Sequence, residues 1–206
     1  MKKLFSLLCV AMMATAASAQ ITWNVKAGAG VATCYGSDTE NAKEHFVGKV
    51  GVGIEYPFTS NWSLMPSLEV AWKGTKINSG GNVYYSGNYY DFDVTTTVDL
   101  FYVQVPIVAA YRLNLSDAWN MTFKAGPYFA YAVSDHYSAK INASDGSSDR
   151  ESGSVEVKKF DTGLDLGIDF EHHRFVFGVE YEMGLMKLVE EDVKNMAFYV
   201  TVGWKF

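Results

Sequence analysis

The sequence has few cysteines and prolines, and it has no long apolar run after its first twenty residues. Two cysteines and four prolines occur in 206 residues. Cys34 is the only cysteine beyond the N-terminal segment, so an intramolecular disulfide is excluded there. A content of 49% hydrophobic and 19% charged residues excludes an intrinsically disordered chain. We therefore expect one folded domain without a helical membrane anchor.

The N-terminal residues have the three parts of a secretory signal peptide. Lys2 and Lys3 are followed by the apolar stretch "LFSLLCVAMMATA" and by the cleavage signal Ala17-Ser18-Ala19. We predict that residues 1–19 are removed and that residues 20–206 form the exported domain. Cleavage leaves 15 basic and 23 acidic residues, because the segment holds two lysines and no acid. This negative balance argues against nucleic acid as a partner.

Alternation with a period of two predicts eight β-strands. The expected strands cover residues 21–34, 45–58, 62–77, 98–113, 119–134, 158–171, 174–187 and 196–206. The connections alternate between short turns at 59–61, 114–118 and 172–173 and longer polar loops at 35–44, 78–97, 135–157 and 188–195. This alternation is typical of an up-and-down meander whose two ends meet different environments.

Each predicted strand has one apolar face without a formal charge, as in Val103, Val105 and Ile107. The opposite face carries most of the strand glycines, and Gly48 is the exception on the apolar side. Because an eight-stranded barrel has a narrow interior, the face rich in glycine is the concave one. The polar face is therefore predicted to point inward and the apolar face outward.

The inward face contains charges of both signs. The predicted lumen network consists of Lys26, Lys49, Glu55, Glu69, Lys73, Arg112, Lys124, Asp161, Asp165, Asp169, Glu180, Glu182 and Lys205. Buried charges require partners, since an unpaired ion loses several kcal/mol of solvation. We expect an ionic plug rather than a conducting pore.

Aromatic residues flank the apolar band on the outward face. One set falls near the short turns: Trp23, Tyr56, Trp62, Tyr111, Trp119, Phe170, Phe175 and Trp204. The other falls near the long loops: Phe46, Trp72, Phe101, Tyr131 and Phe160. Two such girdles are typical of outer-membrane barrels. The predicted fold is all-β, an eight-stranded antiparallel up-and-down transmembrane β-barrel in the cell outer membrane, with strand one paired to strand eight. Bulges are expected at Pro66, Pro106 and Pro127.

Five segments resemble successive strands of the Bacteroidetes-type outer-membrane β-barrel domain, a porin-like family that includes PorT. They are "LFYVQVPIVAAYRL", "FKAGPYFAYAV", "FDTGLDLGIDFE", "VEYEMGLMKL" and "FYVTVGWKF". The resemblance implies an integral outer-membrane barrel with no single activity and no catalytic motif. It also implies recognition of the terminal Phe206 by the barrel-insertion machinery. Gln104 stands where the family often has a glutamate.

Catalytic and metal-binding patterns are weak. Ser134, Asp135, His136 and Ser138 form the best set for a lipid hydrolase, but serine and histidine two residues apart meet the geometry only loosely. The adjacent His172 and His173 point to opposite sides of a strand. We predict no catalytic residue, no metal site and no cofactor.

The loop 78–97 is the most suggestive functional feature. Tyr84, Tyr85, Tyr89 and Tyr90 lie among Gly, Ser and Asn, a composition that is typical of adaptable binding surfaces and also of a solvated hairpin extension. We expect a monomer that contacts outer-membrane lipid and binds an extracellular ligand or protein through loops 78–97 and 135–157. The predicted role is structural or surface recognition, not enzymatic. Alternatives are a narrow porin, a barrel component of a secretion complex, and a soluble lipocalin-like carrier.

Overall fold

The computed structural model describes residues 21–36, 42–85, 88–143, 148–153, 158–187 and 193–206. The predicted signal peptide lies outside these residues. Within them the chain forms ten β-strands: β1 (Thr22–Gly36), β2 (Ala42–Lys43), β3 (His45–Pro57), β4 (Trp62–Tyr85), β5 (Asn88–Asn114), β6 (Trp119–Ala143), β7 (Ser148–Gly153), β8 (Phe160–His172), β9 (Phe175–Gly184) and β10 (Val193–Lys205). No helix in the described part of the chain is long and apolar enough to cross a membrane.

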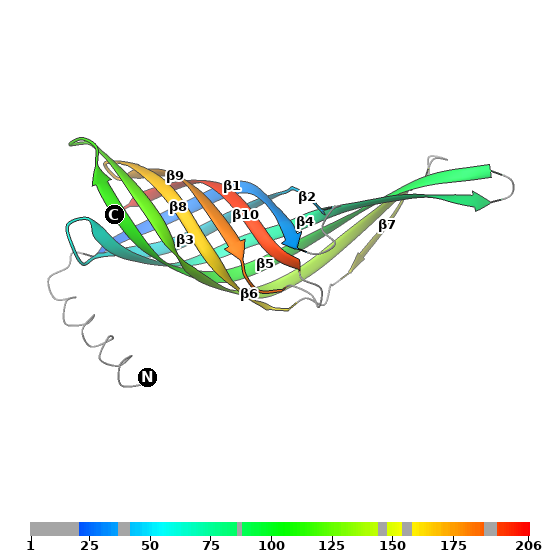
Figure 1. Cartoon of the computed structure of the whole chain (residues 1–206), viewed down its shortest axis with the longest axis horizontal. Helices are drawn as coiled ribbons and strands as arrows, with labels where there is room; N and C mark the ends of the chain where they lie inside the picture. Colours follow the sequence, from blue (N-terminus) through cyan, green and yellow to red (C-terminus); the bar gives the residue numbers. More distant parts are fainter. Residues whose placement is uncertain (1–20, 37–41, 86–87, 144–147, 154–157, 188–192) are drawn as a thin grey trace, which may run out of the picture.

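Eight of these strands form a closed ring. The order β4-β3-β1-β10-β9-β8-β6-β5 is closed by the pairing of β4 with β5 (Figure 1). The first and last strands of the ring, β1 and β10, are antiparallel from Asn24↔Lys205 to Gly36↔Val193. Closure leaves no open sheet edge along the barrel wall. The predicted eight-stranded antiparallel up-and-down barrel is confirmed.

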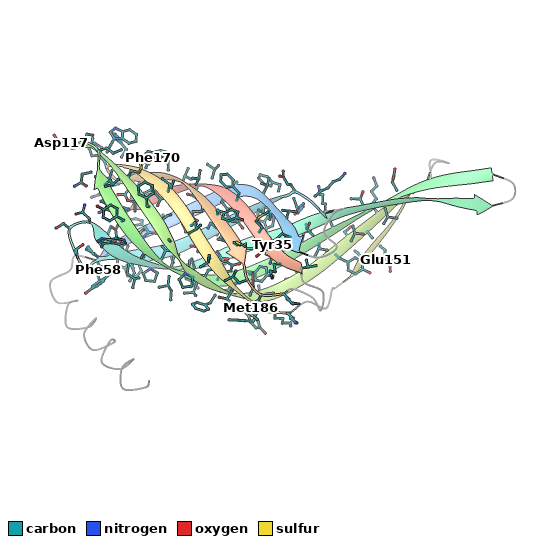
Figure 2. The ribbon with its side chains drawn as sticks, in the orientation of Figure 1. Tyr35, Phe58, Asp117, Glu151, Phe170 and Met186 are labelled. Atoms are coloured by element: carbon teal, nitrogen blue, oxygen red, sulfur yellow. The ribbon has the colours of Figure 1, made fainter. Side chains whose placement is uncertain are left out.

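The two faces of the barrel wall carry the residues that the alternation predicts, apolar ones outside and charged ones inside. On β8, Leu164, Leu166 and Ile168 are exposed on the outside, whereas Asp165 and Asp169 are buried inside. Side chains stand off the outer wall in Figure 2, with Phe170 near the end that carries the short turns. A soluble lipocalin-like carrier would need the apolar face inside, so the structure does not favour that alternative.

Aromatic side chains form rings near both ends of the outer wall. Trp62 and Tyr111 lie side by side on β4 and β5, with ring centroids 5.0 Å apart. At the opposite end, Phe46 and Trp72 approach to 6.3 Å. Between the two rings the exposed side chains are mainly Val, Leu and Ile. This is the surface that a bilayer requires of a barrel.

The segments predicted as loops 78–97 and 135–157 are strands where they are described. β4 and β5 remain paired as far as Tyr85↔Asn88, and β6 continues to Ala143 and pairs with β7. Together they form a sheet that projects beyond the barrel (Figure 1). For 78–97 the structure agrees with the alternative of a solvated hairpin extension, whereas the loop predicted at 135–157 was wrong where it is described, because a strand with water on both faces does not need hydrophobic alternation.

The expected bulges at Pro66, Pro106 and Pro127 are not found. Pairing is interrupted beside Pro66 and Pro106, yet the register is the same on both sides of each interruption. The register shift between β5 and β6 occurs instead at Phe101/Tyr102. A missing proline N–H therefore removes pairings locally without inserting an extra residue.

Gly126 of β6 provides a test of the close packing inside the barrel. A Cβ added there would collide with the carbonyl oxygen of Ile107 on β5. At Gly28 the closest atom to an added Cβ is a side-chain methyl of Thr201, at 3.0 Å. We expect Gly126→Ala to lower the free energy of unfolding by about 1–3 kcal/mol, as overpacking does, and Gly28→Ala to lower it less. Urea titration of the barrel in lipid vesicles measures both, and equal effects would contradict this packing.

Candidate functional site

The charged side chains predicted for the lumen lie on the inward face of the barrel. Eleven of the thirteen are buried, and the exceptions are Lys26 and Arg112, whose side chains are partly exposed. They come from all eight strands of the ring: β1, β3, β4, β5, β6, β8, β9 and β10. Antiparallel pairing with inward alternation brings these distant residues into one column of side chains.

Four charges form a closed group near the short turns. Arg112 contacts Glu55 at 2.7 Å and Glu171 at 3.1 Å, and Lys205 contacts the same two carboxylates at 2.7 and 2.6 Å. Thr122 donates a further hydrogen bond of 2.9 Å to Glu171. Two cations and two anions therefore neutralise each other across β3, β5, β8 and β10. We call these four residues the turn-end quartet.

Glu180 is the centre of a second group, in the middle of the barrel. Lys26 reaches it at 3.0 Å and Lys124 at 2.6 Å, and Lys49 also pairs with it. Lys124 in addition contacts Asp169 at 2.7 Å. One carboxylate on β9 thus links cations from three different strands.

Lys49 extends this central group toward the projecting sheet. It pairs with Glu182 at 2.9 Å and with Glu69 at 3.4 Å, and Lys26 holds Glu69 at 2.7 Å. The amide of Gln104 donates to both Glu69 and Glu182, at 3.1 and 2.8 Å. Lys73 approaches Glu182 at 2.6 Å as an ion pair without the alignment of a hydrogen bond. These contacts cross-link five strands of the ring.

A layer of three buried tyrosines lies on the side of the central group that faces the projecting sheet. The Lys73 ammonium is 4.3 Å from the ring centre of Tyr128, and the Lys49 ammonium is 4.7 Å from that of Tyr199. Tyr128 donates to Asp161 at 3.0 Å, and Asn195 donates to the hydroxyl of Tyr102 at 3.2 Å. The aromatic faces and hydroxyls thus add contacts to the charged groups at this end of the network.

Glu171 is a charged residue of the lumen that the predicted network did not include. Glu171 was missed because it stands at the predicted end of its strand, although its spacing from Asp169 places it on the inward face. With Glu171, eight acidic and six basic side chains of the described residues lie inside the barrel.

Asp165 forms no ion pair within the described part of the chain, and its Oδ1 has no hydrogen-bond partner there. It lines a cavity of about 40 Å³ beside Pro66 and Pro106, which is large enough for a few water molecules.

The other candidate residues lie outside the lumen. Tyr84 and Tyr89 occupy opposite register positions near the tip of the β4–β5 hairpin. Ser134 and His136 are exposed on β6, and no hydrogen bond joins their side chains within the described part of the chain. The ring of His172 contacts Trp119 at 4.5 Å. No group of three metal-ligating side chains occurs among the described residues.

A closed antiparallel barrel with an apolar wall, aromatic girdles and a charged interior defines an integral outer-membrane β-barrel protein. The chain belongs to the outer membrane protein beta-barrel domain family, whose model matches residues 15–190. It is therefore a protein of the outer membrane.

Solved outer-membrane barrels are among the structures similar to this chain. Ail of Yersinia pestis, solved with the heparin analogue sucrose octasulfate, is 17% identical, with 91% of this chain and 99% of Ail covered and a TM-score of 0.41. Neisserial surface protein A is 13% identical, with 89% and 97% covered and a TM-score of 0.44. OprG of Pseudomonas aeruginosa is 10% identical, with 89% and 95% covered and a TM-score of 0.41. A comparison with curated proteins finds no match.

The ion pair between Lys73 and Glu182 tests whether the interior charges stabilise one another. Glu182→Gln is expected to lower the free energy of unfolding by about 3 kcal/mol, because it leaves the buried Lys73 without its ion-pair partner. Lys73→Met should lower it less, because Glu182 keeps its ion pair with Lys49. The double variant should lose less than the sum of the two single variants. Urea unfolding in lipid vesicles gives all three values. Strictly additive losses would show that the two residues do not interact.

Proposed function

We propose that this protein is a surface-recognition barrel, in which a sealed transmembrane barrel carries a binding sheet on the cell surface. The observation that carries the proposal is the projecting sheet formed by the ends of β4, β5 and β6 together with β7. Outer-membrane barrels place short turns in the periplasm and long segments outside the cell. The projecting sheet accordingly faces the medium.

The geometry of the projection suits contact with a large partner. The paired part of the β4–β5 hairpin reaches Tyr85↔Asn88, far beyond the aromatic girdle at Trp72↔Phe101. Tyr84, Tyr85, Tyr89 and Tyr90 occupy successive register positions at its tip. Tyrosine gives a large contact area at a small loss of side-chain entropy. Paired strands also hold such a surface in one conformation before binding, which lowers the entropic cost.

The lumen supports recognition rather than transport. Ion pairs of the turn-end quartet and of the central group link strands that are not neighbours in the ring, and the pair between Lys73 of β4 and Glu182 of β9 joins opposite sides of it. Three tyrosines with no exposed surface occupy the next layer. An ion that entered would have to displace these paired side chains. We therefore infer a non-conducting barrel, and we propose no catalytic role for its residues.

Removal of the tyrosines tests the recognition role. The assay measures how well cells that display the protein bind to an array of glycans and host surface proteins. We expect replacement of Tyr84, Tyr85, Tyr89 and Tyr90 by serine to weaken this binding by tenfold or more. Replacement of the same four residues by phenylalanine keeps the aromatic contact area and should retain most of the binding.

Correct folding of both variants is checked by gel electrophoresis, in which the band of a folded barrel changes its mobility after heating. Binding that survives the serine substitutions, or an array on which the folded wild-type protein binds nothing, would contradict the recognition role.

Conductance tests the inference of a sealed lumen. The purified barrel in a planar bilayer should show no stable single-channel current at 1 M salt. A variant that replaces Lys49, Glu180 and Glu182 by alanine should conduct, because these substitutions remove the centre of the ion-pair network. Stable currents from the wild-type protein would favour the narrow-porin alternative.

A further inference from the structure

The outer wall of the barrel carries an apolar trough that runs along β1. Its floor consists of Ala27 and Ala29 on β1 and Gly48 on β3, and Ala29 and Gly48 are direct neighbours in the register. Valines stand on both sides, because Ala27 faces Val50 on β3 and Val202 on β10. Small residues between larger ones produce a depression in a surface that is otherwise convex.

Trp72 explains why a glycine stands at position 48 on the outward face. Gly48 and Trp72 are paired between β3 and β4, and a Cβ added to Gly48 would lie 3.2 Å from the indole ring. The indole therefore leans over Gly48, and its N–H donates to the carbonyl of Phe46 at 3.3 Å. Trp72, Phe46 and Phe101 together form the end of the trough that lies nearest the projecting sheet.

The trough is long enough to follow a lipid chain. Its upper part has a volume of about 550 Å³ and its lower part about 690 Å³, and the two parts share Ala27, Val50, Val70 and Val202. The lower part ends at Phe175 and Trp204, near the short turns. This surface lies between the two aromatic rings, where the barrel meets hydrocarbon.

Two lysines lie beyond the upper end of the trough, on the same face. Trp72, Gly74 and Lys76 alternate outward along β4, and Lys43 of β2 stands directly opposite Lys76. Like charges in this position repel each other. Among the described residues neither lysine forms an ion pair, and the nearby Asp99 accepts a hydrogen bond from His45 at 2.8 Å. An anion between the two ammonium groups would turn this repulsion into attraction.

We propose that the trough and the Lys43–Lys76 pair bind a phosphorylated, acylated lipid of the outer leaflet. The phosphate lies between the two ammonium groups, just outside the aromatic girdle where lipid headgroups are located. One acyl chain follows the floor formed by Ala27, Ala29 and Gly48. The ligand is part of the surrounding membrane, so this site is separate from the proposed recognition sheet.

Other occupants fit this surface less well. A second copy bound through the same patch in a two-fold dimer would bring two lysine pairs together, which is unfavourable. A free phosphate ion would match the lysines but would make no use of the apolar trough. The lipid alone satisfies both the charge and the apolar surface.

Native mass spectrometry of the purified barrel tests the proposal, with diphosphoryl lipid A and its dephosphorylated form as probes. The double variant Lys43→Gln and Lys76→Gln should bind the phosphorylated probe about tenfold more weakly, because it loses the attraction of two ammonium groups to the anionic headgroup. It should also lose the preference for the phosphorylated form. The matched control, Lys158→Gln with Lys159→Gln, removes two exposed lysines before β8 and should bind within twofold of wild type.

A second set of variants tests binding in the apolar trough. Ala27→Phe, or Ala29→Leu if the first variant does not fold, should weaken binding of both probes, whereas Ala125→Phe on the exposed face of β6 should not. Inorganic phosphate at millimolar concentration should not compete. Equal losses in the two lysine variants, competition by phosphate alone, equal binding of the two probes by wild type, or dimers that fill the trough would overturn the proposal.

Discussion

A backbone amide that faces hydrocarbon has no water to bind, so every N–H and C=O of the wall has to find its partner within the protein. In this chain the requirement is met by a ring in which β1 pairs with β10 and β4 with β5. Closure of the ring fixes an inside and an outside for each strand. The alternation of the sequence then determines the rest of the structure, because each residue must suit either lipid or a narrow interior.

The interior imposes a second constraint that follows from the first. An eight-stranded ring leaves little space, and the inward positions are shared between glycines and long charged side chains. Most of those charges are held by partners from other strands, as in the turn-end quartet, where Arg112 and Lys205 share Glu55 and Glu171. The ion pairs thereby connect strands that are not neighbours in the sheet. Outside the membrane neither constraint applies, so the polar ends of β4, β5 and β6 extend freely into the projecting sheet.

The sequence was most informative where lipid lies on one side of the strand. Val105 and Asp165 could be assigned to opposite faces because a bilayer tolerates no charge on its side of the wall. The extensions of β4 and β5 could only be given as one of two alternatives, since residues such as Gly80 and Asn82 carry no signal that separates a solvated strand from a loop. Glu171 was omitted although it is the last residue of its predicted strand and has the same inward spacing as Asp169. The particular ion pairs also could not be predicted, because a choice such as Lys49 with Glu182 depends on the stagger between strands.

Spin labelling of the outer wall tests the central claim most directly. In a Cys34→Ser background, labels at Val105 and Ile168 should collide with oxygen dissolved in the bilayer and remain inaccessible to a water-soluble nickel chelate. A label at Phe58, in the turn after β3, should show the opposite behaviour. Equal access of the chelate to all three sites would mean that the apolar face does not meet lipid, and it would contradict a barrel that spans the membrane with its charges inside.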